Sequence, residues 1–160
     1  MKAMKMANKA INILRIIGAI SIFMGLIGIV YSIDSIITIP ANLSSHSLSI
    51  DTTYYIIAFW IMISICIACY ISLSVIGYMF IRLYTKMRRL FMVVLIIEIS
   101  YFIIRIIVLS FLGFIGASKL VRSISAAGGV ANGGMMVQFI ILFPLWAPIL
   151  ANWAHKKIQK

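Results

Sequence analysis

Glu98, Tyr101 and Arg105 are the residues of this sequence whose types and spacing could do chemistry. They follow one another at intervals of three and four residues, which places an acid, a phenol and a base on one helix face. The surrounding stretch, residues 90–115, is otherwise almost wholly apolar. Ionisable groups at bilayer depth cost about 2.5–3.5 kcal/mol each on insertion scales, so they usually face protein or water. Proton or ion binding is the chemistry that this trio predicts.

The acid and the base are not well placed to pair only with each other. Seven residues rise about 10.5 Å along a helix, so each side chain needs a further partner. Arg15, near the start of the first apolar run, is the predicted partner of Glu98. Pro144 and Pro148 each free a backbone carbonyl four residues earlier, and we expect Arg105 to donate to these carbonyls. The trio is then either a polar clamp that fixes helix register or a proton- or ion-coupled path, and both interpretations stay open.

A second pattern consists only of small residues at alternating intervals of three and four. Such a seam lets helix backbones approach closely and gives van der Waals contact where lipid offers no hydrophobic drive. We predict that it packs against another helix, either of this chain or of another subunit. Its members are Gly18, Ser21, Gly25, Gly28, Ser32 and Ser35.

Other chemistry is poorly supported by the sequence. Cys66 and Cys69 form a C-x-x-C pair in the middle of an apolar run, whereas redox dithiols need an accessible, electropositive site. We interpret them as two small buried side chains. His46 has no partners at metal-ligand spacing, and no hydrolase, phosphate-loop or paired-carboxylate motif is present. No enzyme activity, metal or cofactor is therefore expected.

Composition predicts an all-α, polytopic membrane protein. Of 160 residues, 64% are hydrophobic and 11% charged, against about 45–50% and about 25% in soluble domains. Four apolar runs each reach the roughly 20 residues needed to cross a bilayer as a helix. The predicted single membrane domain, 1–160, is a four-helix bundle. Its parts are spans 11–33, 54–81, 90–115 and 135–154; outer connections 34–53, where Pro40 should end the first helix, and 116–134, Gly-rich with a short helix; inner connection 82–89; and a basic tail, 155–160.

Charge predicts the orientation of the bundle. The net charge is +11, and most of the basic residues fall before the first span, between the second and third, and after the fourth. These segments share one side when four helices are threaded alternately, so the positive-inside rule places both termini in the cytoplasm. Anionic lipid headgroups at that face are the expected partners, and nucleic acid is not. The Ile- and Lys-rich composition favours a prokaryotic cytoplasmic membrane.

These features together predict a non-enzymatic integral membrane protein. We expect an accessory or assembly subunit of a larger complex that acts through helix packing, with other membrane subunits or further copies of itself as partners. The alternative is a small proton- or ion-coupled transporter or channel with a polar path along Glu98, Tyr101 and Arg105. A membrane enzyme that acts on lipid or quinone ranks third.

Overall fold

The computed structural model describes residues 2–44, 52–114 and 133–158, and within these ranges the chain is helical with no strand. This confirms the predicted all-α class. The helices are α1 (Lys2–Ser44), α2 (Thr52–Ile81), α3 (Arg88–Phe114), α5 (Gly133–Ile140) and α6 (Phe143–Ile158), with a short 3₁₀ helix η1 (Thr85–Met87) between α2 and α3.

Three segments within the described helices are long and apolar enough to cross a membrane. They are Met6–Ile37, Trp60–Ile81 and Thr85–Ile107, and α5 and α6 add a fourth if this bent pair counts as one span. The predicted spans 11–33, 54–81 and 90–115 thus correspond to α1, α2 and α3. Such lengths and compositions are compatible with an integral membrane protein.

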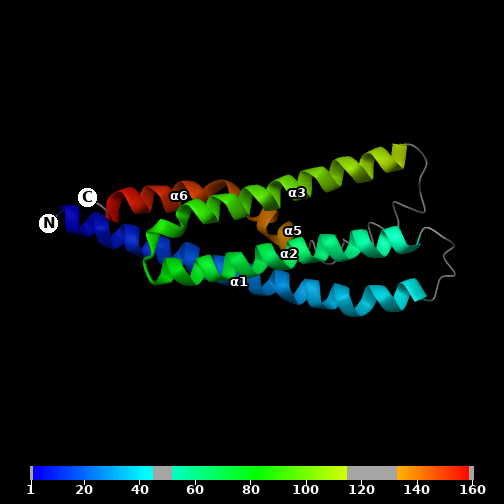
Figure 1. Ribbon diagram of the computed structural model, residues 1–160. Coiled ribbons are helices and arrows are strands. Elements are labelled where there is room, and N and C mark those ends of the chain that lie inside the picture. The colour runs from blue at the N-terminus through cyan, green and yellow to red at the C-terminus, as the bar shows by residue number, and fades with distance from the viewer. Residues whose placement is uncertain (1, 45–51, 115–132, 159–160) are drawn as a thin grey trace.

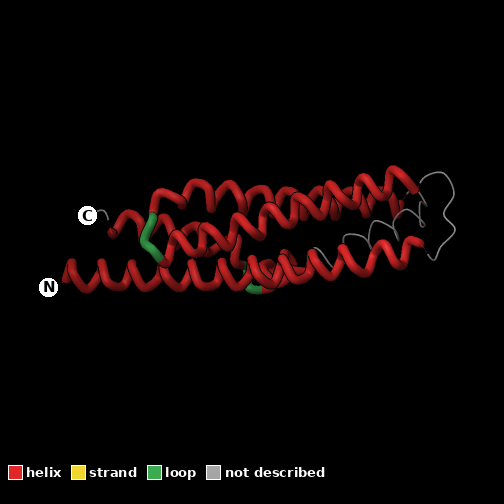
Figure 2. The backbone as a smooth tube through the Cα atoms, turned by 60° about the horizontal axis from the view of Figure 1, so that its bottom comes forward, coloured by secondary structure: helices red, strands yellow, loops and turns green. Residues whose placement is uncertain are grey.

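α1, α2, α3 and α6 run roughly along one common direction (Figures 1 and 2). α1 and α2 lie side by side and make the most extensive contact in the bundle, while α5 and α6 also pack on α1. α3 touches α2 and α6 more sparsely. The two termini lie at the same end of the bundle as the connection from α2 to α3 (Figure 1).

Aromatic rings tie three of the helices together near that end. Phe80 of α2 meets Phe91 of α3 edge-on, with ring centroids 5.2 Å apart. Phe91 in turn meets Phe143 of α6 at 6.1 Å, again edge-on. All three rings are fully buried. Edge-to-face pairs of this kind add about 0.5–1.5 kcal/mol each beyond the area they bury.

The first connection begins later than the sequence predicts. Residues 34–44 continue α1, so the helix passes through Pro40 and ends at Ser44. The prediction that Pro40 ends the helix was wrong, because a proline removes only one backbone donor and its successors keep theirs.

The fourth span is also not the single helix 135–154 that the sequence predicts. α5 and α6 are separated by a break at residues 141–142 and are bent by 65°. Leu142 adopts a left-handed conformation there, with φ of 52°. Pro144 is the second residue of α6. N–H groups in the first turn of a helix have no partner within that helix, so a proline there costs no helical hydrogen bond. The short helix expected within 116–134 falls outside the described residues.

Candidate functional site: a buried polar cluster between α2, α3 and α5

Glu98 lies inside the bundle, near the middle of its length. It is ten residues into α3, about 15 Å from Arg88 at the start of that helix. Its side chain is only 1% exposed, although α3 as a whole presents much of its surface outward. Both of its carboxylate oxygens are buried and have no hydrogen-bond partner among the described residues.

Gln138 of α5 is the neighbour of Glu98. The amide lies near enough to act on the carboxyl group, although the two side chains do not reach hydrogen-bond geometry. Gln138 is itself 1% exposed, and neither its amide oxygen nor its amide nitrogen has a hydrogen bond among the described residues. Sequence reasoning missed this residue, although it is the only amide in the predicted span 135–154 apart from Asn152 near the span's end.

The other two members of the predicted trio border the same cluster. The Tyr101 hydroxyl lies beside the Cys66 thiol of α2, within interaction distance. The Arg105 guanidinium is close enough to act on Cys66 as well, and its buried Nε has no hydrogen-bond partner in the described part of the chain. Cys69, one turn along α2, is within electrostatic range of Glu98. The structure therefore places the trio on the side of α3 that faces the two thiols, with Glu98 buried and Tyr101 and Arg105 half-buried.

Tyr70 closes the cluster on its α1 side and fastens α5 to the bundle. Its hydroxyl accepts a hydrogen bond from the backbone N–H of Met135 at 3.1 Å. Its ring fills the space that Gly28 leaves, since a Cβ at Gly28 would overlap the ring. A Cβ at Gly134 would lie 2.6 Å from the Cα of Gly28, so α5 and α1 also meet almost backbone to backbone.

The small-residue seam of α1 faces other helices of the same chain. All six of its residues are buried. A Cβ at Gly18 would lie 2.6 Å from the carbonyl oxygen of Gly77 on α2, and one at Gly25 would lie 2.6 Å from that of Tyr70. The seam serines donate to carbonyls of their own helix: Ser21 to Ile17 at 2.8 Å, Ser32 to Gly28 at 2.9 Å and Ser35 to Tyr31 at 3.0 Å.

Arg15 does not reach Glu98. The arginine is exposed, because Leu14 and Ile17 take the interior face of α1 at this level. Glu98 meets Gln138 instead. The predicted contact between Arg15 and Glu98 is therefore not formed.

Arg105 does not cap the broken span either. No hydrogen bond joins it to the carbonyls of Ile140 or Pro144 within the described ranges. Carbonyl groups at the break accept hydrogen bonds from residues of α6. The backbone N–H groups of Leu145 and Trp146 both donate to the Leu142 carbonyl, and the Trp146 indole donates to the Ile141 carbonyl. Pro148 lies inside α6 and lines a shallow cleft beside α3.

The cluster combines a buried carboxyl group, an amide and two thiols with the phenols of Tyr70 and Tyr101, and the half-buried Arg105 guanidinium lies at its border. Among the described residues, no group of three or more His, Cys, Asp or Glu side chains could hold a metal ion. A carboxyl group with an adjacent amide can exchange a proton or contribute oxygen ligands to a small cation. Comparison of the chain with protein-family models, curated proteins and solved structures finds no match.

Proposed function

We propose that the protein is an integral membrane protein of a prokaryotic cytoplasmic membrane, with both termini on the cytoplasmic side. The apolar helices are long enough to span, and α3 exposes isoleucines such as Ile96, Ile104 and Ile107 that lipid would cover. The end of the bundle that holds both termini also carries the basic α2–α3 connection and the basic last turn of α6. This asymmetry agrees with the positive-inside rule.

Within this setting, we propose proton- or cation-coupled transport with Glu98 as the binding group. The observation that carries this proposal is the buried carboxyl group beside Gln138, whose two oxygens have no hydrogen bond of good geometry to the described residues. A clamp that only fixes helix register would gain from satisfying these oxygens, whereas unsatisfied buried polar groups cost about 1–3 kcal/mol each. Such groups inside a span are retained where function needs them.

The broken fourth span supports the same proposal. Discontinuous helices near the bilayer midplane are a common device of transporters, because they bring unpaired backbone groups and half-helix ends to a binding site. Gln138 lies two residues before the end of α5 and beside Glu98. The site thus combines an ionisable side chain with the end of a short helix.

Transport is tested in liposomes that contain the purified protein and a pH-sensitive dye. A potassium gradient with valinomycin supplies the driving force, and a sodium gradient is used in a parallel series. We expect flux of protons or sodium above that of empty liposomes, reduced at least tenfold by Glu98→Gln. Asp34→Asn, which removes an exposed acid, should stay within twofold of the unsubstituted protein. Equal flux with and without protein would refute the proposal.

Stability separates a functional Glu98 from a structural clamp. Glu98→Met replaces an unsatisfied buried carboxyl group with an apolar side chain that fits the interior. We expect a gain of about 1–3 kcal/mol in unfolding free energy, measured by titration with SDS in mild detergent. Ile97→Met, at the exposed neighbouring position, should change little. A loss of stability in Glu98→Met would identify the carboxyl group as part of a clamp.

An accessory or assembly role is the second candidate, and the outward face of α3 favours it. This helix packs sparsely within the chain and exposes a run of large apolar side chains, including Ile103, Phe111 and Phe114. The seam on α1 no longer supports an external partner, because it is buried against α2 and α5. Chains that copurify in mild detergent, and that are lost when Ile103 and Phe111 are changed to serine, would favour this role over transport.

A further inference from the structure

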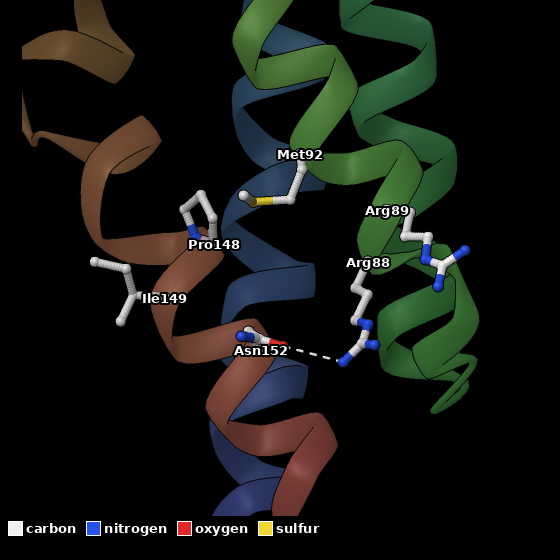
Figure 3. A pocket seen from close by; sticks show the side chains of 6 residues that line it. All are labelled: Arg88, Arg89, Met92, Pro148, Ile149 and Asn152. Carbon is white, nitrogen blue, oxygen red and sulfur yellow. Dashed lines mark hydrogen bonds between the residues drawn. The ribbon is translucent and has the colours of Figure 1, made fainter.

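A cleft of about 370 Å³ lies between the start of α3 and the middle of α6. α3 contributes Arg88, Arg89 and Met92 to its lining, and α6 contributes Pro148, Ile149 and Asn152 (Figure 3). The polar cluster around Glu98 is elsewhere, about 15 Å along α3 from Arg88. The volume of the cleft is at the small end of the range for ligand sites, about 300–1,000 Å³. The cleft would therefore take part of a lipid and not a whole one.

The lining of this cleft changes from charged to apolar along the helices. Arg88 and Asn152 lie at the end of the bundle that holds the termini, and Met92 and Pro148 lie one turn further in. One turn is about 5.4 Å on each helix. The Met92 side chain points toward Pro148 across the cleft (Figure 3). A phospholipid has the same order, with a phosphate at the interface and acyl chains directed toward the bilayer centre.

Arg88 is held in position to bind an anion. One of its terminal nitrogens donates to the Asn152 side-chain oxygen at 3.0 Å, which orients the guanidinium between the two helices (Figure 3). An arginine has five donors in a planar fork that matches phosphate geometry, so donors remain for a ligand. Arg89 extends away from α6 and adds positive charge at the rim.

Charge around the cleft selects an anionic occupant. α6 contains no acidic residue, and its last turn carries His155, Lys156 and Lys157. The only acid of α3 is Glu98, buried about 15 Å from Arg88. Basic pockets between helices at the cytoplasmic surface favour anionic headgroups by about 1 kcal/mol per Lys or Arg.

We propose that this cleft binds one anionic phospholipid, with its phosphate on Arg88 and its upper acyl chain along Met92 and Pro148. The inference rests on the proposed membrane insertion and is independent of transport through Glu98. Arg88 supplies the direct contact, whereas Arg89 acts through charge at longer range. Substitution of Arg88 should therefore weaken binding more than substitution of Arg89.

Native mass spectrometry of the purified protein in mild detergent tests the site with phosphatidylglycerol as the probe. We expect one tightly retained lipid per chain, with affinity reduced about tenfold in Arg88→Gln and about threefold in Arg89→Gln. Lys86→Gln is the matched control, because it removes the same charge two residues away without lining the cleft. Equal losses in Arg88→Gln and Lys86→Gln would show diffuse attraction and overturn the site.

Three further measurements test the occupant and the apolar wall. Met92→Trp keeps every charge but fills the cleft, so it should also reduce retention about tenfold, and unchanged retention would overturn the proposed chain contact. Phosphatidylcholine of the same chain length should bind at least tenfold more weakly, and equal binding would refute the anionic preference. Displacement of the lipid by millimolar inorganic phosphate would show a free-anion site and refute the lipid.

The premise is checked separately. Retention of the protein in membranes after an alkaline carbonate wash is expected for an inserted chain. Loss from the membrane would remove the insertion proposal, and with it the lipid site. Retention combined with unchanged lipid binding in Arg88→Gln would remove the lipid site alone.

Discussion

Replacement of Gly18 by alanine tests whether the tight contact between α1 and α2 holds the bundle together. The added methyl group would lie 2.6 Å from the carbonyl oxygen of Gly77, whereas ordinary contact begins at 3.4 Å. The neighbour is backbone and cannot rotate away, so the two helices must separate locally by up to about 0.8 Å. A gap of this size forfeits about a quarter to a half of the dispersion energy of each contact it opens.

The cost of this substitution follows from two opposing effects. Overpacking of a tight interior costs about 1–3 kcal/mol, and alanine recovers up to about 1 kcal/mol of helix propensity over glycine. We expect a net loss of about 1–2 kcal/mol for Gly18→Ala. SDS titration in mild detergent, followed by tryptophan fluorescence, measures the loss. Ala19→Leu is the control, since position 19 is exposed and has room for a larger side chain.

Gly77→Ala sharpens the test, because a Cβ there would in turn lie 2.6 Å from the Gly18 carbonyl oxygen. Once the first methyl group has separated the helices, the second costs less, so the double variant should lose less stability than the two single losses combined. A coupling of about 0.5–1 kcal/mol is expected for residues that share one gap. Strict additivity, or a Gly18→Ala protein as stable as the unsubstituted one, would refute the reasoning.

Two other predictions concern α2. Tyr70→Phe removes the acceptor of the Met135 N–H group and leaves it buried, so unfolding free energy should fall by about 1–3 kcal/mol; Tyr78→Phe, at an exposed position, should cost less than half as much. Cys66 and Cys69 are 0% and 6% exposed, so a maleimide should label them at least ten times more slowly in the folded protein than in SDS. Equal labelling rates would show that the interior of the bundle is open to reagents.

The sequence predicted the helical class and the three long apolar segments, because hydrophobic length is a property of each segment alone. Pro144 and Pro148 predicted an interruption of the fourth span, but not a 65° bend at residues 141–142. Residues 140–143 are Ile-Ile-Leu-Phe, with no glycine to mark a turn, and Leu142 takes a left-handed conformation that side chains disfavour. Packing of α5 on Tyr70 and Gly28 sets the direction of the helix before the break.

The partners of the polar residues were predicted less well than their burial. Depth along a helix follows from the residue number, and it was the basis for pairing Glu98 with Arg15. Rotation about the helix axis depends on which faces pack, and this turned Arg15 outward and brought Gln138 to Glu98. The lone amide in an apolar run was the clue available for Gln138, by the same argument that singled out Glu98.

The distribution of tight and loose helix contacts indicates which helices would move under the transport proposal. Transport requires Glu98 to face the two sides of the membrane in turn, so some helices must move relative to others. α1 and α2 cannot slide easily, because their backbones meet at Gly18 and Gly77 with no side chain between them. α3 carries Glu98, packs sparsely, and lies beside a fourth span that is already broken. In this proposal the moving part is α3, because α5 is held at Gly28 and Tyr70 and α6 packs on α1; a lipid in the cleft between α3 and α6 would then bridge the moving helix and the fixed part of the bundle.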